Sequence, residues 1–214
     1  MRCVRRAWTC GASGRRAGVT KRVLVTGFEP FGGEDLNASW EAVRLLDGRD
    51  VLGHRVAIRR LSCVFDRCAD ELIEAIESID PAAVIATGVN LDGSAMQIER
   101  VAINLDDARI ADNAQVRPVD RAIVTGGPVA YFSGLPVKAI ARDLTAAQIP
   151  VAVSNSAGTY VCNHLFFALM HYVTTRRPEL PAGFLHVPPR LEPELVAEGL
   201  YLAAERALSG ARAE

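Results

Sequence analysis

Long apolar runs are absent from this sequence of 214 residues. None reaches the roughly 18 residues that a bilayer span requires, and the first residues lack the continuous apolar stretch of a secretory signal. Glycine and proline are modest in number, at 17 and 11 residues, which excludes a fibrous or low-complexity chain. With 50% hydrophobic and 23% charged residues, the chain is globular and long enough to bury a core without disulfides or metal ions.

Cysteine is scarce and odd in number. The five cysteines are Cys3, Cys10, Cys63, Cys68 and Cys162, and this count favours reduced thiols and a cytoplasmic location over a disulfide framework. Cys63 and Cys68 lie too far apart for a CxxC pair, and no second ligand pair follows them. We therefore expect both to be buried small hydrophobic residues, and we expect no metal site.

Acidic residues are missing from the first 22 positions, which hold seven of the 24 basic residues. The rest of the chain then has 17 basic and 25 acidic residues, a formal charge of -8. An acidic body is a poor binder of nucleic acid, because contact with phosphates needs a basic face. We interpret residues 1–21 as a basic extension, favouring a disordered arm or an over-called start over a transit-like peptide, and residues 22–214 as one domain.

Strands and helices are predicted to alternate along residues 22–214. This alternation implies right-handed crossovers and a single α/β domain, with a mostly parallel central sheet and helices on both faces. The segment 99–105 is mixed in character. Apolar, β-branched runs predict strands at 22–27, 56–61, 82–88, 151–155 and 183–187, and helical spacing predicts helices at 37–47, 66–80, 133–148, 160–175 and from 193 onward.

Four segments directly follow predicted strands: residues 28–33, the loop after Gly88, residues 156–162 and His186. Ligands of open α/β sheets bind beyond the carboxyl ends of the strands, so we expect these four segments to converge on one site.

Two aromatic residues flank a proline in the first of these segments. Phe28 and Phe31 lie at the expected ligand edge, where exposed rings suit a small, flat, apolar ligand. The adjacent Gly32-Gly33 pair has neither the lysine of a P-loop nor GxGxxG spacing. A bare turn is therefore favoured there over a phosphate site.

Cys162 is the candidate nucleophile. It follows the small-residue turn 156–159 and falls in the first turn of a predicted helix. The unpaired amides and positive dipole at that helix end favour a thiolate and could also hold an oxyanion. From its position alone, the alternative is a buried cysteine that covers a helix start.

Four histidines compete to be the base. His164 lies about 200° round the helix from Cys162 and faces away from it, and His171 is two turns further along. His54 precedes a strand at the wrong edge of the sheet. His186 alone lies at the carboxyl end of a predicted strand, and we select it. Without Cys162, a core histidine bonded to backbone would be the better interpretation.

A third group must hold the imidazole in the correct tautomer. Glu99 is plausible, because a carboxylate in an otherwise apolar segment usually has a partner. Asp92, Asp106 and Asp107 remain rivals on physical grounds. Asp106 and Asp107, beside Arg109, also fit a solvated turn with a salt bridge.

Long motifs extend in order from about residue 22 to residue 188. They are GFEPFGG at 27–33, Asn37 with SWEAV at 39–43, ERVAINL at 99–105, ARI at 108–110, DN at 112–113, GP at 127–128, AYF at 130–132, LPVK at 135–138, SAGTYVCNH at 156–164 and GFLHVP at 183–188. Together they resemble the pyrrolidone carboxyl peptidase family, the type I pyroglutamyl peptidases.

The resemblance implies a cytoplasmic cysteine peptidase that removes amino-terminal pyroglutamate from peptides, without metal or cofactor and often as a homotetramer. In the family pattern the nucleophile, base and orienting acid fall on Cys162, His186 and Glu99. Amides near Cys162 and after Gly88 would hold the oxyanion. The substrate contacts implied or expected are Phe28, Phe31, Asn37, Val89, Arg109 and Val161.

This chain departs from the family pattern in three places. Many members have Gln-Ala-Gly-Gly-Arg after the glycine at 88, where this chain has VNLDG at 89–93 and so lacks a side-chain amide. PPR at 188–190 replaces the usual proline-aromatic run, and the basic extension has no counterpart. Two alternatives therefore remain: a same-mechanism enzyme acting on another small lactam or amide, and a non-catalytic relative that binds peptide amino termini.

Overall fold

The computed structural model describes residues 21–210. The disordered arm predicted for residues 1–21 lies outside these residues except for Lys21, so that interpretation stays a prediction. The carboxyl-terminal boundary at residue 214 also lies outside them.

A seven-stranded sheet in the order β2-β3-β1-β4-β9-β5-β8 forms the centre of the molecule. Four of its six neighbouring strand pairs are parallel, and β2-β3 and β5-β9 are antiparallel. The predicted α/β domain with a mostly parallel sheet is therefore confirmed. The strands are β1 (Arg22–Phe28), β2 (Asp50–Val51), β3 (His54–Leu61), β4 (Val84–Val89), β5 (Met96–Glu99), β8 (Val151–Ser154) and β9 (Ala182–Val187).

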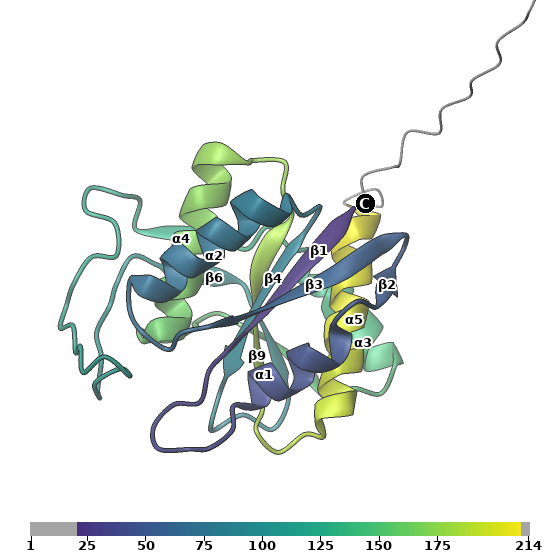
Figure 1. Ribbon diagram of the computed structural model, residues 1–214, viewed down its shortest axis with the longest axis horizontal. Coiled ribbons are helices and arrows are strands. Elements are labelled where there is room, and N and C mark those ends of the chain that lie inside the picture. Colours follow the sequence, from purple (N-terminus) through teal and green to yellow (C-terminus); the bar gives the residue numbers. More distant parts are fainter. Residues whose placement is uncertain (1–20, 211–214) are drawn as a thin grey trace, which may run out of the picture.

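Helices cover both faces of the sheet. One face packs against α2 (Arg67–Ile79) and α4 (Val161–Arg176), and the other packs against α1 (Ala38–Val43), α3 (Val137–Ala146) and α5 (Pro193–Ser209). Alternation along β1 shows the division, since Leu24 belongs to the first core and Val23 and Val25 to the second. Figure 1 shows the helices in these two groups, on either side of the strands.

Four short strands were not predicted from the sequence. The two-residue β2 joins the edge of the sheet, and a separate two-stranded sheet pairs β6 (Val101–Ile103) with β7 (Ala130–Phe132). The fourth, β5, lies inside the main sheet and ends with Glu99. These runs of two to four residues are too short for a periodic pattern to identify them. The helix predicted at 37–47 is also shorter, because α1 continues as a 3₁₀ turn (Arg44–Leu46).

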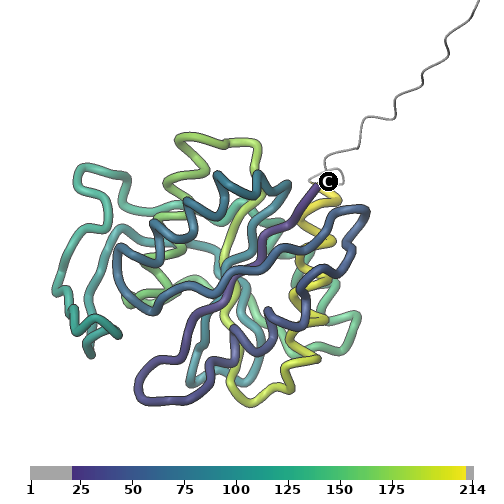
Figure 2. The backbone as a smooth tube through the Cα atoms, in the orientation of Figure 1, coloured from purple at the N-terminus to yellow at the C-terminus, as the bar shows by residue number. Residues whose placement is uncertain are grey.

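A long loop of residues 104–129 joins β6 to β7 and extends beside α2 and α4 (Figure 2). Its two arms are tied together by Asn104, whose side chain donates to Val124 O at 2.9 Å and accepts from Val124 N at 2.8 Å. A backbone bridge between Asp106 and Arg121 adds a second tie. The loop is thus a folded part of the domain, although it contains little regular structure.

Across residues 21–210, no helix is both long and apolar enough to cross a bilayer. The same residues contain no group of three or more His, Cys, Asp or Glu side chains arranged to hold a metal ion.

Candidate active site

The four segments expected to converge line one cavity of about 1110 Å³. The segment after β8 reaches the cavity for a different reason from the one we expected. β8 runs parallel to β5, and β5 runs antiparallel to β9, so β8 points in the opposite direction to β9. The carboxyl-end rule therefore does not apply to β8. The segment after it nevertheless returns to the cavity, and α4 begins there.

Gly88 brings Cys162 and His186 together. In the parallel pairing of β4 with β9, Gly88 lies opposite His186. A β-carbon at Gly88 would lie 2.6 Å from Cys162 Sγ and 3.0 Å from the Phe184 ring. Only glycine leaves room at this position for the thiol, which therefore lies directly against the strand beside His186.

Without a positively charged group beside it, Cys162 is held as a neutral thiol rather than a thiolate by its surroundings. The side chain is half-buried at the second position of α4. Burial, together with the nearby Cys63 and the negative charge of Glu99, raises the pKa of the Cys162 thiol well above its usual value. Burial therefore opposes the effect of the helix end, which was expected to favour a thiolate. A thiolate at neutral pH needs a cation next to it, and His186, which lies opposite Gly88 in the sheet, is the candidate for it.

His186 and Glu99 form a buried pair. The His186 Nδ1–H donates to Glu99 Oε1 at 2.7 Å, and the Glu99 side chain is fully buried. This bond fixes the tautomer and leaves Nε2 free to exchange protons in the cavity. Glu99 Oε2 has no hydrogen-bond partner within residues 21–210, so the pair is the main stabilising contact for this buried charge.

The structure separates Glu99 from its three rivals. Asp92 and Asp107 are exposed side chains that line the cavity. Asp106 is fully buried, where a solvated turn was the sequence alternative. It accepts from His164 Nδ1 at 2.9 Å and from Arg121 Nη2 at 2.7 Å. Glu99 is thus the carboxylate that contacts His186.

The two residues after Cys162 anchor its helix to the loop 104–129 and to β6. Asn163 accepts from Ile103 N at 3.0 Å and donates to Ile103 O and Leu105 O, each at 2.9 Å. His164 bonds to Asp106 through one ring nitrogen and accepts from Asp66 N at 3.1 Å through the other. Together they hold the start of α4 in place.

Aromatic rings form one wall of the cavity. Phe31 and Tyr160 are in contact with ring centroids 5.3 Å apart, and Phe65 packs edge-on against Tyr160 at the same distance. Phe28 also lines the cavity, but as the last residue of β1 it is buried rather than exposed, a correction to our expectation. Tyr160 was not singled out from the sequence, although an aromatic residue directly before the helix of the nucleophile is a usable signal.

Asn37, Val89, Val161 and Arg109 all line the same cavity. Asn37 also has a structural role as the N-cap of α1: its Oδ1 accepts from Ser39 N at 3.0 Å, and its Nδ2 donates to Glu29 O at 2.9 Å. The second proton of Nδ2 remains for a ligand. Val89 and Val161 are the residues beside Gly88 and Cys162, and Arg109 is exposed in the loop 104–129.

Backbone amides in the first turn of α4 are available to a ligand. The N-cap residue Tyr160 makes no side-chain capping bond, so these amides are free of the usual acceptor. The amide of Asn90, in contrast, donates to Val187 O at 3.0 Å. Of the two groups of amides expected to hold an oxyanion, the group at α4 is therefore the stronger candidate.

Several lining residues of the cavity were not among the substrate contacts expected from the sequence. Leu91, Ile110, Pro189 and Arg190 lie in segments whose motifs were noted without a role for these side chains, Cys63 was expected only to be buried, and Leu36 carried no sequence signal.

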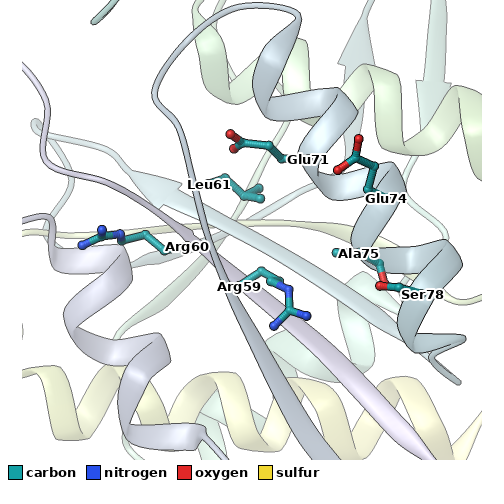
Figure 3. Close-up of a pocket in the computed structure, with 7 residues that line it drawn as sticks. All are labelled: Arg59, Arg60, Leu61, Glu71, Glu74, Ala75 and Ser78. Carbon is teal, nitrogen blue, oxygen red and sulfur yellow. The ribbon is translucent and has the colours of Figure 1, made fainter.

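A second, smaller hollow of about 380 Å³ lies between β3 and α2 (Figure 3). Its Glu71 carboxylate is already occupied, since it accepts from Ser62 N and Ser62 Oγ at 2.7 Å and from Arg67 Nε at 2.9 Å. Figure 3 shows no cysteine or histidine among the residues that line this hollow. The cavity beside Cys162 is therefore the candidate active site.

Comparison with known proteins agrees with this geometry. A family model described as pyroglutamyl peptidase matches residues 21–204. A pyrrolidone-carboxylate peptidase of Cupriavidus necator is 47% identical over 202 residues, which cover 88% of this chain and 94% of that protein. One from Pectobacterium carotovorum is 51% identical over 168 residues, or 78% of each chain.

The fold is shared as well. The crystal structure of pyroglutamyl peptidase I from Bacillus amyloliquefaciens matches with a TM-score of 0.86 and 39% identity, over 88% of this chain and 97% of that one. The pyrrolidone carboxyl peptidase from Thermococcus litoralis matches with a TM-score of 0.85 and 35% identity, over 88% of this chain and 94% of that one. On the family match, the sequence identity and the shared fold, this chain belongs to the pyroglutamyl peptidase family.

Proposed function

We propose that this protein is a thiol-dependent omega peptidase that removes amino-terminal pyroglutamate from peptides. The observation that carries the proposal is one cavity in which Cys162 Sγ lies against Gly88, opposite a His186 ring held by buried Glu99. A nucleophile, a base and an orienting acid in this order are what acyl transfer requires.

The first half of the reaction forms a thioester. His186 Nε2 takes the proton of Cys162, and the thiolate attacks the carbonyl carbon that joins pyroglutamate to the next residue. The negative oxygen of the tetrahedral intermediate is held by free amides in the first turn of α4. His186 then gives its proton to the leaving nitrogen, the C–N bond breaks and the shortened peptide leaves with a free amino terminus.

The second half restores the enzyme. A water molecule gives a proton to His186 and attacks the thioester carbonyl. The C–S bond then breaks, pyroglutamate leaves with the hydroxyl of that water, and Cys162 recovers its proton from His186. Glu99 holds Nδ1 through both halves and stabilises the imidazolium.

The lactam ring is assigned to the inner part of the cavity. Phe28, Phe31 and Val161 supply an apolar surface for a flat ring, and Asn37 supplies a spare N–H for an acceptor. Val89 and Arg109 line the same space and are proposed as further contacts. All the side chains named in this paragraph line the same cavity, and this supports the assignment of the lactam ring to it.

Val89 also favours a second candidate, hydrolysis of a different small lactam or amide. It occupies a position where the family pattern has a side-chain amide, and a valine makes no hydrogen bond to a lactam. A panel of cyclic amides with rings of different size separates the two candidates by their relative kcat/KM.

The decisive experiment measures release of a fluorogenic amine from pyroglutamyl and prolyl amides by the purified chain in reductant. We expect turnover of the pyroglutamyl amide only, and its loss in Cys162→Ala. Cys68→Ala is the matched control, because Cys68 is a fully buried thiol on α2 outside the cavity, and we expect it to keep its activity. Equal turnover by Cys162→Ala would contradict the mechanism.

We propose further that the enzyme works in the cytoplasm and as a homo-oligomer, a tetramer by the family resemblance. Cys63, Cys68 and Cys162 are free thiols, which suits a reducing compartment. Val119, Val129 and Phe132 are large, exposed apolar side chains of the loop 104–129 and of β7, and they suit burial between copies. Light scattering of the purified chain tests this: a monomer mass would contradict the proposal.

A further inference from the structure

The cavity is larger than one lactam ring requires. Its volume of about 1110 Å³ exceeds the range of roughly 300 to 1,000 Å³ that holds typical small-molecule ligands. Space therefore remains beyond the part assigned to pyroglutamate. A peptide substrate continues past the scissile bond, so the next residue must occupy part of this space.

Three large apolar side chains line this cavity and yet remain strongly exposed. Leu36 is 67% exposed, Leu91 is 71% exposed and Ile110 is 55% exposed. They come from three separate segments: the loop before α1, the loop after β4 and the loop 104–129. A single exposed leucine has no special meaning, but exposed apolar side chains that line one cavity from separate loops favour a binding surface.

Leu91 is presented by a loop that is held in shape. The neighbouring Asn90 donates to Gln97 Oε1 at 2.7 Å, and its backbone amide donates to Val187 O. Its side-chain oxygen accepts from Asp92 N, and its carbonyl accepts from Gly93 N. Leu91 lies within the 89–93 segment in which this chain departs from the family pattern.

Charge gives this region little selectivity. The charged side chains in the lining are Glu34, Asp92, Asp107, Arg109 and Arg190, three acidic and two basic, and all are exposed. Their opposite fields largely cancel and are screened by solvent. The apolar side chains are therefore the feature of the opening that can distinguish one peptide from another.

We infer that Leu36, Leu91 and Ile110 form a subsite for the side chain of the residue that follows pyroglutamate, and that this subsite prefers large aliphatic residues. The inference rests on the proposed function. Contact with the substrate removes apolar surface from water on both partners, which favours leucine over alanine. Because the opening is partly solvated, only part of the full transfer free energy is gained.

The test compares kcat/KM for two amidated dipeptides, pyroglutamyl-leucine and pyroglutamyl-alanine, by chromatography of the released amino acid amide. We expect the wild-type chain to prefer the leucine peptide by about fivefold to tenfold. In Leu91→Ala we expect the ratio of kcat/KM for the leucine peptide to that for the alanine peptide to fall to about two. In the double variant Leu91→Ala/Ile110→Ala we expect this ratio to fall to about one.

Leu52→Ala is the matched control. Leu52 is 53% exposed, in the turn between β2 and β3, and does not line the cavity, so this variant should keep the full preference. A wild-type ratio near one, or the same ratio in Leu91→Ala as in Leu52→Ala, would overturn the inference. So would a change in oligomeric mass for Leu91→Ala, which would assign the side chain to an interface between copies.

The same assay distinguishes this inference from the proposed function. Hydrolysis of a pyroglutamyl fluorogenic amide without preference between the two dipeptides contradicts the subsite alone. Failure on all three substrates by a folded chain contradicts the proposed function first, and the subsite falls with it.

Discussion

Two buried histidine-carboxylate pairs lie close to Cys162 in the sequence or in space. In one, His186 Nδ1 donates to Glu99 at 2.7 Å. In the other, His164 Nδ1 donates to Asp106 at 2.9 Å. Both histidines are less than a tenth exposed and both carboxylates are fully buried. By composition and by distance, either pair could orient a catalytic base.

The second ring nitrogen makes the difference. His164 Nε2 accepts from Asp66 N at 3.1 Å, so both of its nitrogens are occupied and it has no proton to exchange with a substrate. The Nε2 of His186 belongs to a ring that lines the cavity. Asp106 is also shared with Arg121, whereas within residues 21–210 Glu99 bonds only to His186. An imidazole can act as a base only where one nitrogen stays free for the substrate.

Replacing the base should have the largest effect on activity. We expect His186→Ala to lower kcat/KM by about 10⁴-fold, because proton transfer to and from the ring is lost. Hydrolysis of a pyroglutamyl amide measures the loss, and circular dichroism shows that the variant is folded. A decrease of less than tenfold would show that the free nitrogen is not what separates the two pairs.

Neutralising the orienting acid should have a smaller effect. We expect Glu99→Gln to lower kcat/KM by about 10²-fold, because the amide oxygen can still accept from Nδ1 but cannot stabilise an imidazolium. The unfolding free energy should fall little, since the change removes a buried charge. Activity equal to that of the wild type would contradict the role of Glu99.

Thiol reactivity should also depend on His186. Burial and Glu99 raise the pKa of the Cys162 thiol, so a chain without the imidazolium holds a neutral thiol at pH 7. We expect His186→Ala to react with iodoacetamide about tenfold more slowly than the wild type at pH 7, with a rate that is still rising above pH 9. Peptide mass spectrometry locates the label. Equal rates at pH 7 would indicate that α4 alone ionises the thiol.

Breaking the second pair should affect stability far more than chemistry. We expect His164→Ala to lower the free energy of unfolding by about 3 kcal/mol, because buried Asp106 loses a donor and the Asp66 amide loses its acceptor. The kcat/KM of the folded fraction should fall by less than tenfold. Urea denaturation, with half-buried His171→Ala on the same helix as control, measures the first effect. A loss as large as that of His186→Ala would make the two pairs equivalent.

Sequence reasoning identified Cys162 and His186 because each directly follows or ends a recognisable element. It left the acid open on physical grounds, and the family resemblance supplied Glu99. Physics could not choose because Glu99 ends a four-residue strand without a periodic pattern, and because Asp106 looked like part of a solvated turn. The burial of Asp106 depends on Arg121 and His164, which lie 15 and 58 residues away in the chain.

The sequence by itself determined the α/β class, the long helices and most strands, since these depend on local periodicity and on glycine and proline at their ends. The tertiary structure decided which carboxylate meets which imidazole, the reversed direction of β5 and β8, and the pKa of the thiol. These depend on contacts between distant segments and on burial, and no local pattern encodes either. Leu91 shows the two contributions together. The sequence identifies the unusual loop that contains Leu91, and the fold places Leu91 in the lining of the same cavity as Leu36 and Ile110.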